Sequence, residues 1–289
     1  MKIQGLYTAL VTPFRNGEVD YDRLTKLIEM QIDAGVDGIS PVGTTGESPT
    51  LSFEEHERVI ATVVQLVNGR CRILAGSGAN STAEALHLTK CAKADGADFS
   101  LQVAPYYNKP TQEGLYRHFA TIADSCDIPI VIYNVPGRSG VAVSAETIAR
   151  LAKNHNVAGV KEASGSVDRV SEILDLCDIP VLSGDDALTV PMMSVGAVGV
   201  VSVASNVIPK EMKQLVDLCA AGDFGMASAM HRKLYRLFNG MFIETNPIPV
   251  KAAMAMRGLI EEEYRLPLCP LADKNREVLR QILADVPVD

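Results

Sequence analysis

The chain has 289 residues, 47% of them hydrophobic and 21% charged, which is enough apolar material for one large core and close to the usual size of a single closed α/β barrel. Its formal net charge of −8 argues against a general surface for nucleic acids or anionic membranes, because such surfaces cluster lysine and arginine against phosphates. A small-molecule partner is therefore expected, and if that partner is an anion, local donors in the site must bind it.

Eight short runs rich in β-branched and other apolar residues predict strands, at residues 6–11, 38–42, 72–75, 99–104, 129–135, 157–161, 180–183 and 198–203. Several runs are almost entirely apolar, which is typical of parallel strands buried on both faces. Amphipathic segments lie between them, and their expected N-terminal caps are Asp20, Ser52 with Glu55, Ser81 with Glu84, and Ser144. This alternation predicts a (β/α)8 TIM barrel. A doubly wound open sheet is the alternative, but no GxGxxG motif follows any strand run.

Helical patterns alone follow residue 203, with segments at 226–238, 249–259 and 274–284. We expect residues 1–208 to hold the barrel strands and most helices. Residues 209–289 should hold the last barrel helix and a C-terminal helical extension in the same folding unit, as a lid or a layer between subunits. Residues 187–209 carry no charge, but prolines and glycines interrupt them, so a buried helix and strand are expected there rather than a membrane span.

The cysteines and histidines form no metal-binding motif. Six cysteines lie at wide spacings without a CxxC pair, and five histidines are dispersed without HExxH. This pattern predicts reduced thiols, no metal site and a cytoplasmic location. The first ten residues lack the apolar run of a signal peptide.

One lysine is found where barrel enzymes place their catalytic residues, at the carboxyl end of a strand. Lys161 follows the apolar residues 157–160, and burying an ammonium group is unfavourable. Lys161 therefore either pairs with a carboxylate such as Glu162 or Asp185, or is held as a neutral amine that can form a Schiff base.

Hydroxyl groups at neighbouring strand ends favour the second interpretation. Tyr133 ends the adjacent strand, and Thr44-Thr45 follow another, so proton transfer beside Lys161 is plausible. Each has a structural alternative, since Tyr133 could be a core ring and the threonines could cap a turn. Gly43 and Gly46 free the backbone around the threonines to approach a small anion such as a carboxylate.

Charged residues at two other strand ends have different expected roles. Arg138 lies between Gly137 and Ser139, where its planar guanidinium could bind a second carboxylate, the alternative being a surface ion pair. Asp185 and Asp186 are adjacent, so in an extended strand they face opposite sides and cannot act as a catalytic pair. We expect them to have a supporting role.

Three motifs together resemble the pyruvate-dependent class I aldolase family, and within it the dihydrodipicolinate synthases. They are Gly-Thr-Thr-Gly-Glu-Ser at 43–48, Tyr-Asn-Val-Pro-Gly-Arg at 133–138 and Gly-Val-Lys-Glu-Ala at 159–163. The resemblance covers essentially the whole chain. It implies condensation of pyruvate with L-aspartate 4-semialdehyde to 4-hydroxy-tetrahydrodipicolinate, on the route to diaminopimelate and lysine, without a cofactor.

The resemblance also implies roles for single residues. Lys161 would form the imine with pyruvate, and Tyr133, Thr44 and Tyr107 would relay protons. The same resemblance implies a homotetramer in which Tyr107 enters the neighbouring subunit's site. The substrate-binding residues would be Thr45 for the pyruvate carboxylate, Arg138 for the aldehyde's carboxylate, and Gly184 and Val201 lining the pyruvate pocket.

The family's inhibitory lysine pocket is matched at five positions, namely Ser48, His56, Asn80, Glu84 and Tyr106. Pro49 and Phe53 replace the smaller and more polar residues usual beside it. Inhibition by L-lysine is therefore a hypothesis that depends mainly on His56 and Glu84, and His56 could equally be an ordinary helix-face histidine.

Two other functions remain open at this level. A sibling lyase acting on a sugar acid such as N-acetylneuraminate would share Lys161 and Tyr133, but the sialic acid lyases lack the Gly-Arg pair and the Thr-Thr turn. A catalytically silent metabolite-binding barrel should have lost Lys161 or its proton relay, and neither is lost here.

Overall fold

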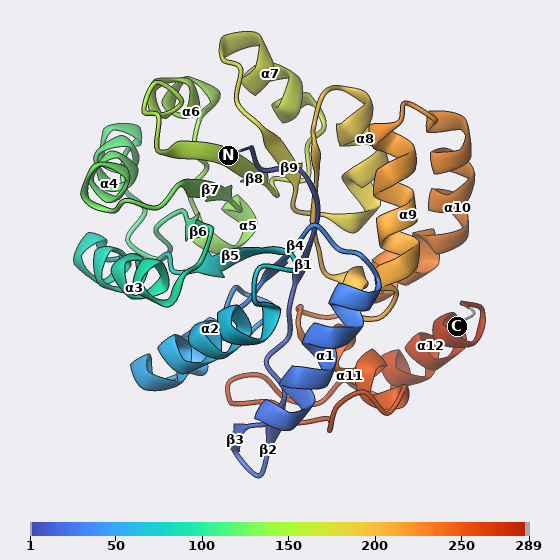
Figure 1. Cartoon of the computed structure of the whole chain (residues 1–289). Coiled ribbons are helices and arrows are strands. Elements are labelled where there is room, and N and C mark those ends of the chain that lie inside the picture. Colours follow the sequence, from blue (N-terminus) through green and yellow to red (C-terminus); the bar gives the residue numbers. More distant parts are fainter. Residues whose placement is uncertain (1, 287–289) are drawn as a thin grey trace.

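Eight parallel strands close into a barrel in the computed structural model, which describes residues 2–286 (Figure 1). Around the barrel the order is β1, β10, β9, β8, β7, β6, β5 and β4, which returns to β1. The bounds are Gly5–Ala9 for β1, Gly38–Ser40 for β4, Arg72–Gly76 for β5, Phe99–Val103 for β6, Ile130–Asn134 for β7, Val157–Glu162 for β8, Val181–Ser183 for β9 and Gly199–Ser202 for β10. The predicted (β/α)8 barrel is confirmed, and an open sheet is excluded.

A ring of helices covers the outside of the strands (Figure 1). Its members are α1 (Tyr21–Asp33), α2 (Phe53–Val67), α3 (Thr82–Asp95), α4 (Gln112–Ser125), α6 (Ala145–Leu151), α7 (Asp168–Leu176), α8 (Thr189–Ser194) and α9 (Pro209–Ala220). Short helical turns occupy the loops after β4, β7, β9 and β10, namely η1 (Ser48–Thr50), α5 (Pro136–Ser139), η2 (Asp186–Leu188) and η3 (Ala204–Asn206).

Three of the four predicted helix caps form their hydrogen bonds. The Asp20 carboxylate accepts from the Arg23 N–H, the Ser144 hydroxyl accepts from Thr147, and Ser52 with Glu55 makes a complete capping box. The fourth prediction is wrong in its detail: Ser81 precedes α3, but its side chain makes no capping hydrogen bond. Ser81 has extended backbone dihedral angles, and α3 begins directly after it. The predicted position of the helix start is therefore correct, but the side-chain capping bond expected there does not form.

A two-stranded hairpin that the sequence patterns did not predict lies beside α1 (Figure 1). It pairs β2 (Phe14–Arg15) with β3 (Glu18–Val19) through a turn in which Asn16 and Gly17 both have positive φ. The N–H groups of the turn donate to the Glu263 carboxylate. Two-residue strands are too short to show a pattern, and a contact with a residue nearly 250 positions away holds them.

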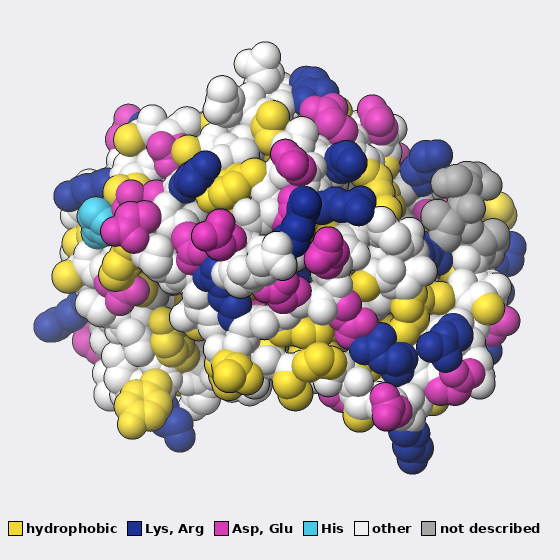
Figure 2. All heavy atoms as spheres, turned by 90° about the horizontal axis from the view of Figure 1, so that it is seen from below, with side chains coloured by type: hydrophobic (Ala, Val, Ile, Leu, Met, Phe, Trp, Pro, Cys, Tyr) yellow, Lys and Arg dark blue, Asp and Glu magenta, His cyan; other side chains and the backbone are white. Residues whose placement is uncertain are grey.

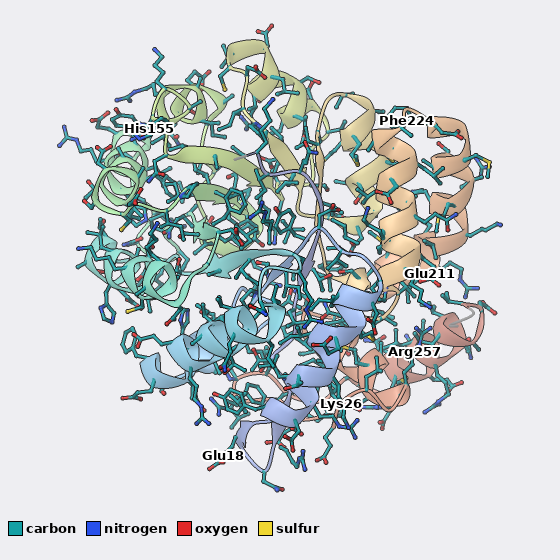
Figure 3. The ribbon with its side chains drawn as sticks, in the orientation of Figure 1. Glu18, Lys26, His155, Glu211, Phe224 and Arg257 are labelled. Atoms are coloured by element: carbon teal, nitrogen blue, oxygen red, sulfur yellow. The ribbon has the colours of Figure 1, made fainter. Side chains whose placement is uncertain are left out.

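Three helices follow the eighth barrel helix, α9, which packs on β1. They are α10 (Phe224–Gly240), α11 (Ile248–Met256) and α12 (Asp273–Ala284), as predicted to within a few residues. Arg257, labelled in Figure 3, lies at the C-terminal end of α11. Its guanidinium donates to the carbonyls of Val207, just after η3, and Val286, just after α12, and so connects α11 to both segments.

The apolar core has two layers, as a closed barrel requires. The larger layer fills the space between strands and helices, and the smaller one fills the barrel itself. Tyr7 is a fully buried member of the inner layer, and a Cβ at Gly38 would lie 2.3 Å from its ring. The interior is therefore packed with side chains, and a substrate must bind at the carboxyl end of the strands.

Charge on the outer surface is mixed. In the face shown in Figure 2, basic and acidic side chains are interspersed, without a continuous basic stretch of the kind that binds phosphate backbones. No helix among residues 2–286 is both long enough and apolar enough to span a bilayer.

Candidate active site

Lys161 and Tyr133 lie side by side at the carboxyl end of the barrel. They are register partners on β8 and β7, and because side chains at matched positions of neighbouring strands point to the same face, both point the same way. Lys161 Nζ lies 4.1 Å from the centroid of the Tyr133 ring, and Lys161 is only 6% exposed. A buried amine beside a phenol is the arrangement that imine chemistry with proton transfer requires.

The carboxylates that could have paired with Lys161 are bound elsewhere. Glu162 accepts hydrogen bonds from the Asn134 side chain and the Ser164 N–H. The Asp185 carboxylate accepts from the Ala187 N–H. Within residues 2–286 Lys161 makes no ion pair, so the salt-bridge interpretation of this lysine is excluded for the described chain.

Asp186 has the supporting role that was predicted. It is fully buried, and its Oδ2 accepts from the N–H groups of Val203 and Ala204, which begin the turn after β10. Burial raises the pKa of its carboxyl to about 6. Asp185 and Asp186 therefore bind different backbone segments and do not form a catalytic pair.

A second buried lysine, which the sequence analysis missed, belongs to the C-terminal extension. Lys251 of α11 is 0% exposed, and its Nζ lies 2.5 Å from Glu47 Oε1, also 0% exposed. The ring of Phe14 covers the ammonium at 4.3 Å. Lys251 is the one charged residue of α11. A single lysine in an otherwise uncharged helix is a sequence signal for a buried ion pair, and it could have been noticed. Lys251 is ion-paired and completely enclosed, whereas Lys161 has no carboxylate partner in the described chain. Lys161 is therefore the better candidate for a nucleophile.

The turn that follows β4 is shaped by backbone conformation. Val42 and Glu47 on either side of it both have φ near +55°, which is unfavourable for residues with a Cβ and must be held by the surroundings. A Cβ at Gly46 would lie 2.9 Å from the Val42 nitrogen, so only glycine fits. The Lys251–Glu47 pair holds one end of this turn.

The turn leaves donors available for an anion. The N–H groups of Gly46, Glu47 and Ser48 donate hydrogen bonds within the turn. Their acceptors are the backbone carbonyls of Gly43 and Thr44. The N–H groups of Thr44 and Thr45 make no hydrogen bond to any described residue. Two adjacent free N–H groups form a small cradle that suits a carboxylate, as the glycines around the turn had suggested.

Asn246 connects the two predicted carboxylate-binding residues, and sequence reasoning did not identify it. Its amide nitrogen donates to Thr45 Oγ1 at 3.0 Å, and its backbone carbonyl accepts from Arg138 Nη2 at 2.9 Å. Its side-chain oxygen is buried without a hydrogen-bond partner. Arg138 is thus held in the site rather than in a surface ion pair, although it reaches a backbone carbonyl and no carboxylate in the described chain.

A cavity of about 690 Å³ opens beside these residues; Arg138 lines it, whereas Thr45, Asn246 and Lys161 lie behind its walls. Thr44, Tyr133 and Arg138 line its inner part, and the phenol of Tyr133 is the surface on which Lys161 Nζ lies. The cavity continues outward to four of the five residues of the predicted lysine pocket, Ser48, His56, Glu84 and Tyr106. One continuous space therefore joins the candidate active site to the candidate regulatory site.

Gly184 and Val201 border the space around Lys161. A Cβ at Gly184 would lie 3.2 Å from Lys161 Cε and 2.6 Å from the Ala163 Cβ, so glycine leaves room above the lysine stem. Val201 is buried in the same interior cluster as Tyr133. Neither residue lines the cavity within the single chain.

Tyr107 is not part of the site within a single chain. Its side chain is 90% exposed and its backbone has φ +73°, an uncommon conformation for a bulky residue. Asn80 and Asn108 hold its loop, because Asn80 donates to the Tyr106 carbonyl and Asn108 donates to the Asn80 carbonyl. The phenol is therefore held away from the rest of its own subunit.

The outer part of the cavity combines polar and apolar walls. His56 is buried, and burial lowers its pKa below the usual range, which favours the neutral imidazole. Pro49 and Phe53 also line this part. Phe53 is 55% exposed at the cavity mouth, which makes this entrance more apolar than the family pattern suggested.

Comparison with known proteins identifies related chains over nearly the full length. The model of the dihydrodipicolinate synthetase family matches residues 2–286. The chain is 56% identical over 283 residues to the 4-hydroxy-tetrahydrodipicolinate synthase of Hydrogenobaculum sp. (strain Y04AAS1), covering 97% of this chain and 98% of that one. The crystal structure of the Aquifex aeolicus dihydrodipicolinate synthase superposes with a TM-score of 0.96 at 52% identity, covering 98% of this chain and 97% of that chain.

Two similar structures were solved with small molecules. A chloride-inhibited dihydrodipicolinate synthase of Acinetobacter baumannii, in complex with pyruvate, has a TM-score of 0.97 and 47% identity, with coverage of 98% and 99%. The Cyanidioschyzon merolae enzyme, with lysine bound, has a TM-score of 0.95 and 40% identity, with coverage of 98% and 97%.

Proposed function

Because the chain belongs to the dihydrodipicolinate synthetase family, it is a lyase that condenses pyruvate with L-aspartate 4-semialdehyde to 4-hydroxy-tetrahydrodipicolinate, and we propose that Lys161 carries the covalent step. The reaction belongs to the route to diaminopimelate and lysine. The observation that carries the residue assignment is the buried Lys161 amine, which lies on the Tyr133 ring and has no carboxylate partner in the described chain.

The steps follow from the chemistry of a lysine amine. Lys161 Nζ attacks C2 of pyruvate, and loss of water gives an imine. Loss of a proton from the methyl carbon gives an enamine, which forms the new carbon–carbon bond with the aldehyde carbon. The amino group of the former semialdehyde then attacks C2, closes the ring and releases Lys161 as an amine.

Proton transfer is assigned to three hydroxyl groups. Tyr133 is adjacent to the amine, and Thr44 lines the same cavity. Tyr107 from a neighbouring subunit would complete the relay. Its 90% exposure and its positive φ support this role, because a strained and exposed aromatic residue is unfavourable in an isolated subunit and gains contacts in an assembly. We propose that this neighbouring subunit belongs to a homotetramer, as the family resemblance implies.

Two carboxylates are bound at separate points. The free N–H groups of Thr44 and Thr45, with the Thr45 hydroxyl, suit the pyruvate carboxylate. Arg138 suits the semialdehyde carboxylate, since only one of its guanidinium nitrogens is occupied by Asn246. Gly184 and Val201 are assigned to the wall of the pyruvate pocket. Sialic acid lyases lack the Thr-Thr and Gly-Arg pairs, which argues against the sugar-acid alternative.

L-lysine is the proposed inhibitor at the outer end of the cavity. Glu84 offers a carboxylate for an ammonium group, and Ser48, His56 and Tyr106 offer polar contacts. Asn80 would act through the loop of Tyr106, to whose carbonyl it donates. Phe53 and Pro49 narrow the same space, so we expect weaker inhibition than in a pocket with polar residues there.

A cytoplasmic location is also proposed. Its support is the set of six cysteines, all of them free, together with the biosynthetic role of the related enzymes.

Reductive trapping tests the assignment of the nucleophile. The protein is treated with pyruvate and borohydride, and the modified peptide is identified by mass spectrometry. We expect one adduct on Lys161, none on Lys251, and none in the Lys161→Ala variant. An adduct on Lys251 would refute the assignment while leaving the reaction intact. A coupled assay with L-aspartate 4-semialdehyde, run beside N-acetylneuraminate, tests the reaction itself.

A further inference from the structure

Three potential metal ligands meet on the outer surface of the barrel, away from the active site. Glu57 lies on α2, and His87 and Cys91 lie on α3, which packs beside α2 (Figure 1). Residues four positions apart on a helix share one face, so His87 and Cys91 both point toward Glu57. One ligand atom from each residue lies within 4.8 Å of the other two.

The distances match a tetrahedral ion. Zinc bonds of about 2.0–2.3 Å to nitrogen, oxygen and sulfur at tetrahedral angles place neighbouring ligand atoms roughly 3.4–3.6 Å apart. His87 Nε2 lies 3.2 Å from Glu57 Oε1 and 3.9 Å from Cys91 Sγ. The Glu57 and Cys91 ligand atoms lie within 4.8 Å of each other, so side-chain shifts of up to about 1 Å would bring all three atoms onto one ion.

The imidazole is already held in this position. The ring of Phe53 packs edge-on against that of His87, with centroids 6.3 Å apart and an interplanar angle of 77°. Phe53 is one of the two residues, with Pro49, that depart from the family pattern at the neighbouring pocket. The aromatic contact limits the rotation of His87 and so lowers the entropy that metal binding must overcome.

The charges around the three residues favour a cation. Neither Glu57 nor nearby Asp95 forms an ion pair with a lysine or arginine in the described part of the chain. The carboxylates therefore place negative charge beside the imidazole and the thiol, without an ion-paired lysine or arginine among residues 2–286 to balance it.

We propose that Glu57, His87 and Cys91 form a surface site for a divalent ion of the zinc class, with water as the fourth ligand. The mixture of nitrogen, sulfur and one oxygen suits zinc and its neighbours, whereas magnesium and calcium prefer oxygen ligands. The bound ion would connect α2 to α3. This site is independent of the lyase reaction, because none of its ligands lines the active-site cavity.

Cobalt(II) is the probe, because a cobalt–thiolate bond gives a charge-transfer absorption that reports sulfur ligation directly. The intact protein, reduced and freed of metal, is titrated with Co²⁺. We expect one equivalent to bind per chain with a thiolate band, and Zn²⁺ to displace it. Removal of one ligand, in Cys91→Ser, His87→Ala or Glu57→Gln, should raise the dissociation constant at least about tenfold.

Cys269→Ser is the matched control, since Cys269 is an exposed free thiol outside the cluster. It should leave the titration unchanged. A band that persists in Cys91→Ser, or is lost in Cys269→Ser, would overturn the proposal, as would the absence of a thiolate band.

Proton release gives a second readout. Because zinc binds the thiolate and not the thiol, metal binding to Cys91 should release a proton and strengthen as the pH rises. An affinity that does not change between pH 6 and 8 would contradict thiolate ligation. Lyase activity of the metal-free variants should equal that of the metal-free parent, which distinguishes this test from a test of the reaction.

Discussion

Replacing Lys251 by methionine should destabilise the protein strongly although no residue that contacts substrate is altered. Lys251 Nζ and Glu47 Oε1 lie 2.5 Å apart, and both side chains are 0% exposed. Removing one partner of such a pair leaves an uncompensated buried charge, which costs about 3–5 kcal/mol. Because Glu47 ends the turn that holds Thr44 and Thr45, kcat/KM should also fall more than about tenfold.

A double-mutant cycle measures the coupling. Glu47→Gln removes the carboxylate charge that Lys251→Met leaves unpaired. The free energy of unfolding of the double variant Glu47→Gln/Lys251→Met should therefore be at least about 2 kcal/mol higher than that of Lys251→Met alone. Urea unfolding, followed by far-ultraviolet circular dichroism at one fixed chain concentration, gives the free energies of unfolding.

Lys213→Met is the matched control. Lys213 also lies 2.5 Å from a carboxylate, that of Asp217, but Asp217 is 58% exposed, and such pairs contribute under about 1 kcal/mol. If Lys251→Met costs no more than Lys213→Met, or if the two effects in the double variant simply add, the reasoning is refuted.

Three further predictions concern single residues. Arg138→Ala should lower kcat/KM for the semialdehyde about 10- to 150-fold, the worth of a charged hydrogen bond, and spare pyruvate trapping; equal loss of both would contradict its role. Asn246→Ala should raise the KM for pyruvate about fivefold by removing the donor to Thr45, and leave the KM for semialdehyde unchanged, because Arg138 uses the backbone carbonyl. Burial lowers the pKa of His118 to about 4. Between pH 6.5 and pH 4 this histidine therefore binds a proton in the unfolded chain but not in the folded chain. The free energy of unfolding should decrease as the pH is lowered, by up to about 3 kcal/mol at pH 4. His118→Gln should remove this part of the acid sensitivity in urea titrations, and an unchanged pH dependence would show that His118 is not its source.

The strand and helix order of this barrel is determined locally. Apolar runs of four to seven residues and amphipathic segments repeat eight times, and their lengths and periods are properties of adjacent residues. The hairpin of β2 and β3 was not predictable, because two-residue strands have no period and Glu263 holds their turn. Ser81 shows the limit of a cap motif, since the helix starts there without the capping bond.

The candidate nucleophile was also evident from the sequence, because Lys161 is a charge at the end of an apolar strand and barrel geometry directs such residues to one rim. The tertiary structure alone decided that Glu162 binds Asn134 and leaves this lysine unpaired. It also introduced Asn246 and Lys251, whose partners Thr45 and Glu47 lie 201 and 204 positions away. Sequence periodicity reports on neighbours within a few turns, whereas these contacts exist only because the C-terminal helices fold back over the loop after β4.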